Sequence, residues 1–452
     1  MGEETHDRIQ NTVRRRPNSQ QVLRLDETRS RAGATFGWDR PMSQLSDPTG
    51  GTLGPRMYAW VAAIGIGLAA GAYGIVSVLT QGAVVLGIDS QIPWGILIST
   101  YVLFALFSTG ICIGVTSLSS VFGVDRFDPV AKRGILLSLF TLAAGGLVIM
   151  AGLGQPLRAI PQMLLAANPS APMWWMIVLY SVYSAALVAE FYLLDRADQP
   201  SGWVTRGVGI VALVAPILAG AMLGAIFGTA EARPYYGEMF ASVYLLVTAV
   251  FSGVALLTAV AVIERRFTAA TPTGISEELI TGTLGRYLGV LAAITLFLTG
   301  LRHAYGLTAT NEALALASEQ MLLGTHSVWT VGVGIVLGMV VPTVLLASSK
   351  TRSVGSVLIA SVLVIVGMFA SRLEFVLGGQ VVALTNDPSH QVPIVSYVPS
   401  VAEIAIVTAG VALFALLYTA GWVLFDLDEL PSHRERSMDH AGGDTSEVTG
   451  DD

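Results

Sequence analysis

The sequence has few of the side chains that hold redox centres. It contains one cysteine, Cys112, which lies inside an apolar run, whereas a protein-held iron–sulfur cluster needs about four cysteines. None of the histidines falls in the middle of an apolar segment, where haem b would need paired axial ligands; they are His6, His303, His326, His390, His433 and His440. No metal-ligand spacing or nucleotide-binding motif is visible. We therefore expect no haem, no iron–sulfur cluster, no metal and no disulfide in this chain.

Charged residues are also scarce. Only 13% of the 452 residues are Asp, Glu, Lys or Arg, against about 25% in soluble domains, and 53% are hydrophobic. Apolar runs long enough to span a bilayer as a helix, about 20 residues each, occur at 57–80, 94–122, 134–152, 173–194, 204–228, 239–263, 284–307, 327–347, 354–372 and 400–425. The composition predicts an all-α polytopic membrane protein with about ten transmembrane helices.

We place the membrane domain at 56–426, and the two tails outside it have no apolar runs long enough to span a bilayer. Residues 1–55 and the acidic segment 427–452 are predicted to be disordered. The Arg14–Arg16 triplet is not a twin-arginine export signal, because no apolar run follows until about Arg56. All but four of the 25 lysines and arginines fall in the tails or in loops on the same side. This bias predicts that both termini are cytoplasmic in the cell membrane.

The four exceptions suggest a polar layer at the outer ends of the helices. Arg158, Arg233, Arg302 and Arg372 each lie close to a helix end, one in each of four outer connections. Arginine near a bilayer usually has a partner or a task, although each could simply mark an interface. The outer segment 378–399 is too polar to span, and we expect an ordered loop or short hairpin there.

Aromatic and polar residues gather at these outer ends in a pattern that suits a quinone. Such a ligand needs an apolar slot, hydrogen-bond donors to its two carbonyls and a titratable group that exchanges protons. Candidates from the second span and from the break between the third and fourth spans are Trp94, Tyr101, Gln155, Arg158, Trp174 and Tyr180.

The loop between the fifth and sixth spans adds a further candidate group. Glu231, Arg233, Tyr235, Tyr236 and Glu238 occur within eight residues at a membrane boundary. Desolvation raises the pKa of a carboxyl group at such a boundary and a neighbouring arginine lowers it, which suits a proton relay. The alternative is that the glutamate and arginine form a salt bridge that closes the loop.

At these residues the chain resembles the NrfD/PsrC family, the membrane subunits of polysulfide, dimethyl sulfoxide and nitrite reductase systems. Its ten-helix branch resembles the membrane subunit of some hydrogenases and of alternative complex III. The motifs are IPWGILISTYVLFALFSTG at 92–110, LGQPLRA at 153–159, NPSAPMWWMIVLYSVYSAALVAE at 168–190, RPYYGEMFASVYLLVTAVFSGVALL at 233–257 and SRLEFVLGGQ at 371–380.

The resemblance implies two four-helix bundles plus flanking helices, with bundle one at about 94–263 and bundle two at about 239–375. It implies that a quinone or menaquinone binds as substrate near the outer face. Electrons pass between it and a ferredoxin-like iron–sulfur subunit, which serves a molybdopterin or other catalytic subunit. The chain is then not catalytic alone. The implied catalytic residues are Glu231 and Arg158, and the pocket residues are Trp94, Tyr101, Gln155, Arg158, Trp174, Tyr180, Arg233 and Tyr235.

Two positions depart from the family pattern. Gly152 and Gln155 stand where many relatives have an acidic residue and an arginine or histidine. Another carboxylate must then move the proton, and we expect Glu231 at the pocket and Glu190 as the entry of a proton path. The alternatives are a membrane anchor that lacks a working quinone site, or a secondary transporter, although transporters usually carry charge near the membrane midplane.

Overall fold

The computed structural model describes residues 55–427, apart from 154, 156–157, 159–160, 163–164, 166, 196–201, 238, 268–274, 385–392 and 426. The two predicted disordered tails lie outside the described residues, except for residues 55 and 427. Within the described part, ten helices are long and apolar enough to cross a membrane, which confirms the predicted number of spans and an all-α, multi-pass membrane protein.

The spans are assembled from α-helices and three π-helical segments. They are α2 (Pro55–Gln81), α3 (Ile96–Ile111) with η4 (Cys112–Thr116) and α4 (Ser117–Ser120), α5 (Asp128–Gly152), α7 (Pro172–Asp195), α8 (Gly202–Gly228), α9 (Met239–Phe267), η7 (Leu279–Leu284) with α10 (Gly285–Leu307), η8 (Val328–Val340) with α12 (Val341–Ala347), α13 (Val354–Gly378) and α14 (Val401–Leu424). Short connecting helices are η3 (Gly82–Val85), η5 (Asp125–Phe127), η6 (Pro234–Tyr236) and α11 (Glu312–Leu322).

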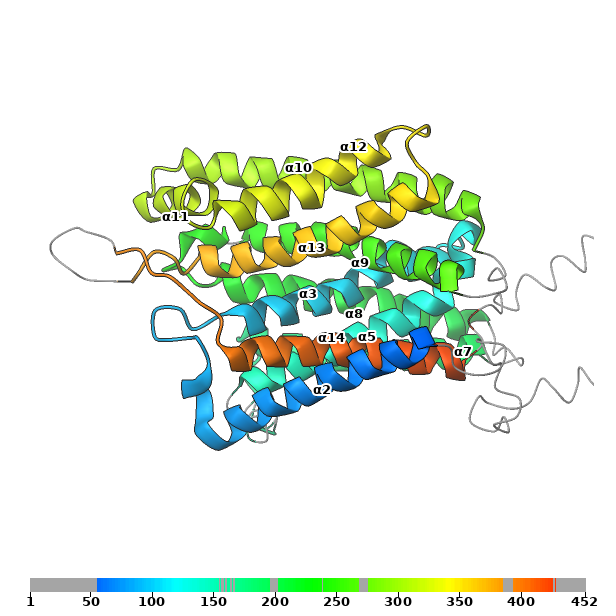
Figure 1. The fold of residues 1–452 in the computed structure, drawn as a ribbon, viewed down its shortest axis with the longest axis horizontal. Helices are drawn as coiled ribbons and strands as arrows, with labels where there is room; N and C mark the ends of the chain where they lie inside the picture. The colour runs from blue at the N-terminus through cyan, green and yellow to red at the C-terminus, as the bar shows by residue number, and fades with distance from the viewer. Residues whose placement is uncertain are drawn as a thin grey trace, which may run out of the picture.

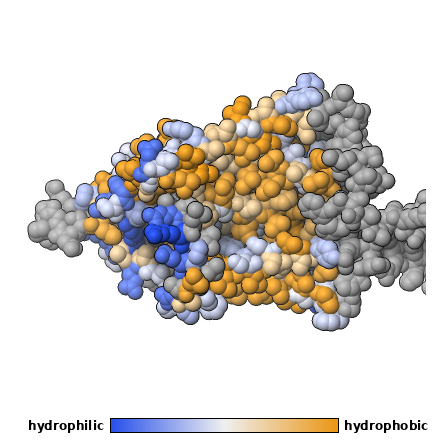
Figure 2. Space-filling model, turned by 90° about the horizontal axis from the view of Figure 1, so that it is seen from below, coloured by the Kyte–Doolittle hydropathy of each residue, from blue (hydrophilic) through white to orange (hydrophobic). Residues whose placement is uncertain are grey.

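We term the end of the bundle where α2 begins and α14 ends the proximal face, and the opposite end the distal face. In Figure 1 the proximal face is on the right, and α11 lies at the distal face on the left. The space-filling view shows a broad apolar belt in the middle of the molecule and a strongly hydrophilic patch towards the distal end (Figure 2). This is the pattern expected of a protein that spans a bilayer.

Helix α3 lies at the centre and contacts both halves of the protein. On one side it packs against α5, with α7 and α8 paired beyond it; on the other it packs against α9, which contacts α10 and α13. Helices α2 and α14 pack against each other along their length, and α14 makes most of the contact between this pair and α5. The contact between α3 and α9 is close because Gly110 has no side chain; a Cβ there would clash with the Ala249 carbonyl oxygen. Gly110 is therefore a packing position, where two helix backbones approach each other closely.

A buried ion pair ties helices together towards the proximal face. Arg133 on α5 donates to Glu264 on α9 at 2.7 Å and to the Leu427 carbonyl at 2.8 Å, and Tyr418 on α14 donates to the same carboxylate. Both ionic side chains are almost wholly buried. The bridge therefore fixes the end of α14 against the body of the protein.

The distal loops are more structured than hydropathy alone indicates. Residues between the seventh and eighth spans form α11, whose start is capped by Asn311 accepting from the Leu314 N–H at 3.1 Å. In the segment 378–399, a single antiparallel bridge joins Val382 and Ile394, and 385–392 lie outside the described residues. The expected loop or hairpin is thus present in its described part.

Candidate functional site

The segment before α3 is held in place by side chains from distant parts of the chain. The Gly87 N–H donates to Glu403 at 3.0 Å, and the Ile96 N–H donates to the Tyr397 hydroxyl at 2.9 Å. Gln380 binds both backbone groups of Trp94, accepting from its N–H at 3.0 Å and donating to its carbonyl at 2.9 Å. Because Gln380 is completely buried, the position of Trp94 at the start of α3 is firmly fixed.

The predicted pocket residues of α3 and α7 lie in or beside one apolar cluster. Trp94 packs against a buried cluster that contains Tyr101 and Tyr180. The Tyr101 hydroxyl contacts the Met176 sulfur at 3.2 Å, one helical turn from Tyr180. Trp174 precedes this methionine on α7 and stacks edge-on against Trp175. Tyr101 and Tyr180 thus lie in one buried cluster, and Trp94 borders it through its ring contacts with Phe227 and Tyr236.

This cluster contains hydrogen-bonding atoms that no side chain satisfies. The Trp174 Nε1 and the Tyr180 hydroxyl are buried and have no hydrogen-bond partner within the described part of the chain. The Thr109 hydroxyl is likewise without a partner at normal hydrogen-bond distance, but it is close enough to interact with the Tyr180 hydroxyl. Buried polar groups are normally paired, so donors of this kind indicate water or a ligand. An apolar, aromatic environment with free donors is what a quinone ring and its carbonyls require.

The loop around η6 sends its two tyrosines in different directions. Tyr236 lies against Trp94 and Phe227, with ring centroids 6.0 and 5.1 Å away, and donates to the Val376 carbonyl at 2.9 Å. Tyr235 instead donates to Glu374 on α13. Tyr235 is therefore bound to α13 in the structure, and Tyr236, which the sequence did not single out for the pocket, contacts Trp94.

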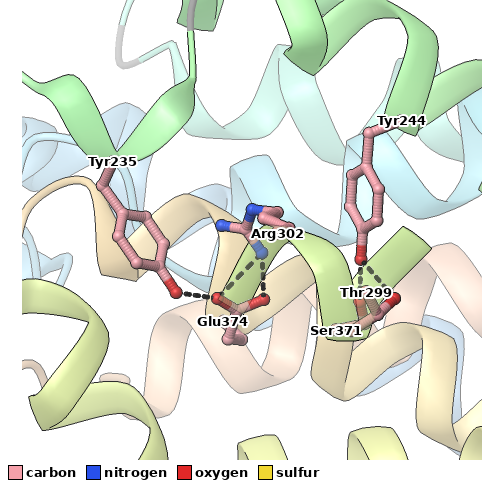
Figure 3. A network of polar contacts seen from close by, with 6 residues as sticks. All are labelled: Tyr235, Tyr244, Thr299, Arg302, Ser371 and Glu374. Carbon is pink, nitrogen blue, oxygen red and sulfur yellow. Dashed lines mark hydrogen bonds and ion pairs between the residues drawn. The ribbon is translucent and has the colours of Figure 1, made fainter. Parts of the chain in front are cut away.

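Tyr235 is part of a buried charged network that joins α9, α10 and α13 (Figure 3). Arg302 on α10 donates from Nη1 to both Glu374 oxygens, at 3.1 and 3.0 Å. The two side chains are only 9% and 3% exposed. The Tyr244 hydroxyl points the other way, to Thr299 and Ser371 at 3.2 and 3.4 Å. Burial and the charge of Glu374 raise the pKa of Tyr235, so its phenol stays protonated and donates to the carboxylate.

A cleft of about 470 Å³ opens at the distal face beside this network. Its walls come from the η6 loop, α11 and the residues that end α13; they are Ala232, Arg233, Pro234, Tyr235, Ala313, Ala317, Gly378, Gly379, Val382, Ala383 and Leu384. The guanidinium of Arg233 has a structural role, because it donates to the Gly379 carbonyl at 2.9 Å and to the Gln91 carbonyl at 3.1 Å. It thus joins the η6 loop to the ends of two other segments.

The remaining predicted site residues are apart from these buried groups. Arg158 and Gln155 are exposed and lie 3.4 Å apart at Nη1 and Oε1. Glu231 is exposed, and among the described residues its carboxylate forms no ion pair with Arg158 or Arg233. Glu190 lies towards the proximal end of α7, only 2% exposed, and both its oxygens are without a hydrogen-bond partner in the described chain.

Residues 84–383 match the family model described as polysulphide reductase, NrfD. The chain belongs to the NrfD family. The match covers about two thirds of the sequence. It includes eight of the ten spans, from α3 to α13, and the distal loops between them.

Curated NrfD-like relatives are membrane subunits of reductase and oxidoreductase complexes. The membrane subunit of a putative dimethyl sulfoxide reductase of Halobacterium salinarum is 28% identical over 79% of this chain and 87% of its own length. The Hdr-like menaquinol oxidoreductase integral membrane subunit of Archaeoglobus fulgidus is 25% identical over 75% and 86%. A selenate reductase subunit of Mesobacillus selenatarsenatis is 23% identical over 61% and 71%.

Two features of this NrfD-family chain were not predicted from the sequence. The Glu374–Arg302 pair was missed, although a glutamate two residues after an arginine near the end of an apolar span is itself a signal, since ionisable groups there are rare. Gln380 was missed because its partners are the backbone of Trp94, 286 residues earlier. No group of three or more His, Cys, Asp or Glu side chains in the described part could hold a metal ion.

Proposed function

We propose that this chain is the quinone-reactive membrane subunit of a respiratory oxidoreductase complex. In this proposal the distal face is the outer face and both termini are cytoplasmic. Quinol is oxidised in the first bundle and its electrons pass to a ferredoxin-like iron–sulfur subunit that serves a molybdopterin-type catalytic subunit. Family membership and a relative named as a menaquinol oxidoreductase subunit support the class of reaction.

The observation that carries the quinone site is the aromatic cluster with two free donors. Trp174 Nε1 and the Tyr180 hydroxyl are positioned to bind oxygen atoms, and Trp94 and Tyr101 supply apolar surface around them. Tyr180 is 8% exposed, so a hydrogen bond there forms in a low-dielectric environment. We assign these four residues to the walls of the quinone pocket.

The exposed residues have separate roles in this proposal. We assign Arg158 and Gln155, which are exposed and in contact with each other, to the mouth of the pocket, where the arginine would attract the anionic form of the substrate. Glu231 accepts protons and releases them to the outer solvent, which its exposure allows. Arg233 and Tyr235 hold the η6 loop against α13, through Gly379 and Glu374 respectively.

We also propose a proton path along α3 and α7. Glu190 is buried towards the proximal end, near the Ser120 hydroxyl and Cys112. Further along, Tyr183 and Ser108 are hydrogen-bonded at 3.1 Å. Buried polar groups without partners are commonly satisfied by internal water, and such waters conduct protons between hydroxyl groups. These side chains and the waters between them would connect the proximal side with the quinone pocket at Tyr180.

Neighbouring tryptophans on α7 provide a matched test. In the purified complex, Trp174→Phe and Tyr180→Phe should each lower kcat/KM for quinol about tenfold, the effect of one lost hydrogen bond of ~1.4 kcal/mol. Trp175→Phe is the control, because its indole donates to the Pro169 carbonyl on an exposed surface. Full activity in both Trp174→Phe and Tyr180→Phe, with the complex assembled, would remove the pocket from this position.

The mouth of the pocket is tested independently. Arg158→Ala and Glu231→Gln should lower quinol oxidation while assembly persists, because both side chains are exposed and support no buried contact. Unchanged quinol oxidation in both variants would contradict their assignment. A fully assembled complex in which the chain never reacts with quinol would show a membrane anchor instead.

A further inference from the structure

The second bundle holds more buried positive than negative charge. Arg302, Arg372 and Glu374 are buried close together between α9, α10 and α13. The side chain of Arg302 is 9% exposed, and the residues Arg372 and Glu374 are 0% and 5% exposed. Within the described chain, the only carboxylate that acts electrostatically on Arg372 is Glu374. Two arginines and one glutamate leave a net charge of about +1, and any proton on His303, which also faces this group, would add to it.

The single carboxylate is already used by its neighbours. Both oxygens of Glu374 accept from Arg302 Nη1, and one also accepts from Tyr235. Arg372 has one hydrogen bond, from Nη2 to the Thr248 hydroxyl at 2.7 Å. Its Nε and Nη1 are buried without a partner among the described residues, as are Arg302 Nη2 and His303 Nε2.

The position of Arg372 makes this arrangement unfavourable unless a counter-charge is present. It lies six residues before the end of α13 at Gly378, about 9 Å along the helix, and is completely enclosed by protein. A buried ion without a partner costs several kcal/mol even after relaxation. Water would satisfy the N–H groups but would supply no charge.

We propose that Arg372 binds a small monovalent inorganic anion such as chloride. Its Nε and Nη1 donate to the ion, and the ion balances the net positive charge of the cluster. The complete burial of Arg372 favours a small ion over an organic ligand. This inference is independent of the proposed quinone chemistry, because it concerns a different bundle and a group that the pocket does not use.

One group of the chain itself could supply the same charge. The Tyr244 hydroxyl shares hydrogen bonds with Thr299 and Ser371, and its ring stacks under the guanidinium of Arg302 at 5.3 Å. An ionised Tyr244 would neutralise the cluster without an added anion. The experiment must therefore separate an anion from solution from a charge that the protein carries.

The test compares the thermal stability of the purified complex in sodium chloride and in sodium gluconate at equal ionic strength. Chloride at about ten times its dissociation constant should raise the melting temperature of the chain by about 3 °C. Arg372→Met should abolish this difference, and in gluconate it should be at least as stable as the native protein, because the unpaired charge is gone. Arg286→Gln, an exposed arginine on α10, is the matched control and should keep the chloride effect.

Two results would overturn the proposal. Equal melting temperatures in chloride and gluconate would show that no solution anion is bound. A chloride effect that persists in Arg372→Met would place the anion elsewhere. As a second measurement, a cryo-electron microscopy map of the chloride-loaded complex should show density at Arg372 Nε and Nη1 that is absent from the gluconate map.

Discussion

The Arg302–Glu374 pair predicts a large and specific loss of stability in Glu374→Gln. The amide keeps the size of the carboxylate but carries no charge, so Arg302 is left buried without its partner. Breaking a buried pair from one side typically costs about 3–5 kcal/mol, because the remaining charge is uncompensated. The Tyr235 hydroxyl can still donate to the amide oxygen, so its hydrogen bond adds little to the loss.

This cost converts into a measurable change in melting temperature. At about 2 °C per kcal/mol for a chain of this size, the apparent melting temperature should fall by about 6–10 °C. Detergent-purified protein followed by the fluorescence of its tryptophans provides the measurement. The matched control is Glu312→Gln on α11, an exposed carboxylate at the same face, which should change the melting temperature by less than about 1 °C.

A double variant separates a true pair interaction from general damage. Removing both charges in Glu374→Leu with Arg302→Met should restore most of the stability, because an apolar pair of similar volume is often neutral or better in a buried site. Methionine also preserves contacts with the rings of Tyr235 and Tyr244 that the guanidinium now covers. A Glu374→Gln variant as stable as the native protein, or a double variant as unstable as Glu374→Gln, would refute the reasoning.

Two further outcomes follow from close packing and from buried backbone groups. Gly110→Leu should prevent the contact of α3 with Ala249 on α9 and lower the yield of folded protein several-fold in size-exclusion chromatography; Gly146→Ala, where a Cβ meets no atom within 4 Å, should leave the yield unchanged. Gln380→Leu should raise the KM for quinol several-fold with a smaller change in kcat, because the Trp94 backbone loses both of its hydrogen bonds to Gln380; an unchanged KM would separate Trp94 from the pocket.

The spans were predictable because hydropathy is a local property. Ten apolar runs of sufficient length lead directly to ten helices, and only four basic residues fall in the predicted outer connections. The arginines of the other side were also informative, since Arg302 and Arg372 are buried in a polar cluster and Arg233 is half-buried. Helix α11 has a comparable local signal, an asparagine cap before a run of alanine, leucine and glutamate, and could have been found.

The arrangement of the site was less accessible because it depends on pairs far apart in the chain. Tyr235 and Tyr236 are adjacent and chemically identical, and only the short turn of η6 decides that one reaches Glu374 and the other Trp94. The partner of Arg302 lies 72 residues later, with no local pattern that would connect the two. Arginines near the ends of the spans were visible in the sequence, but the contacts that these residues make with one another were not.

The segment that leads into α3 has a consequence for how the protein is made. Trp94 lies in the first quarter of the chain, yet the groups that fix this segment belong to residues 380, 397 and 403. During synthesis, eight further spans must enter the membrane before these side chains become available. The proposed quinone pocket is therefore completed last, after almost the entire protein has been inserted, and an incompletely synthesised chain would not present a finished pocket to its substrate.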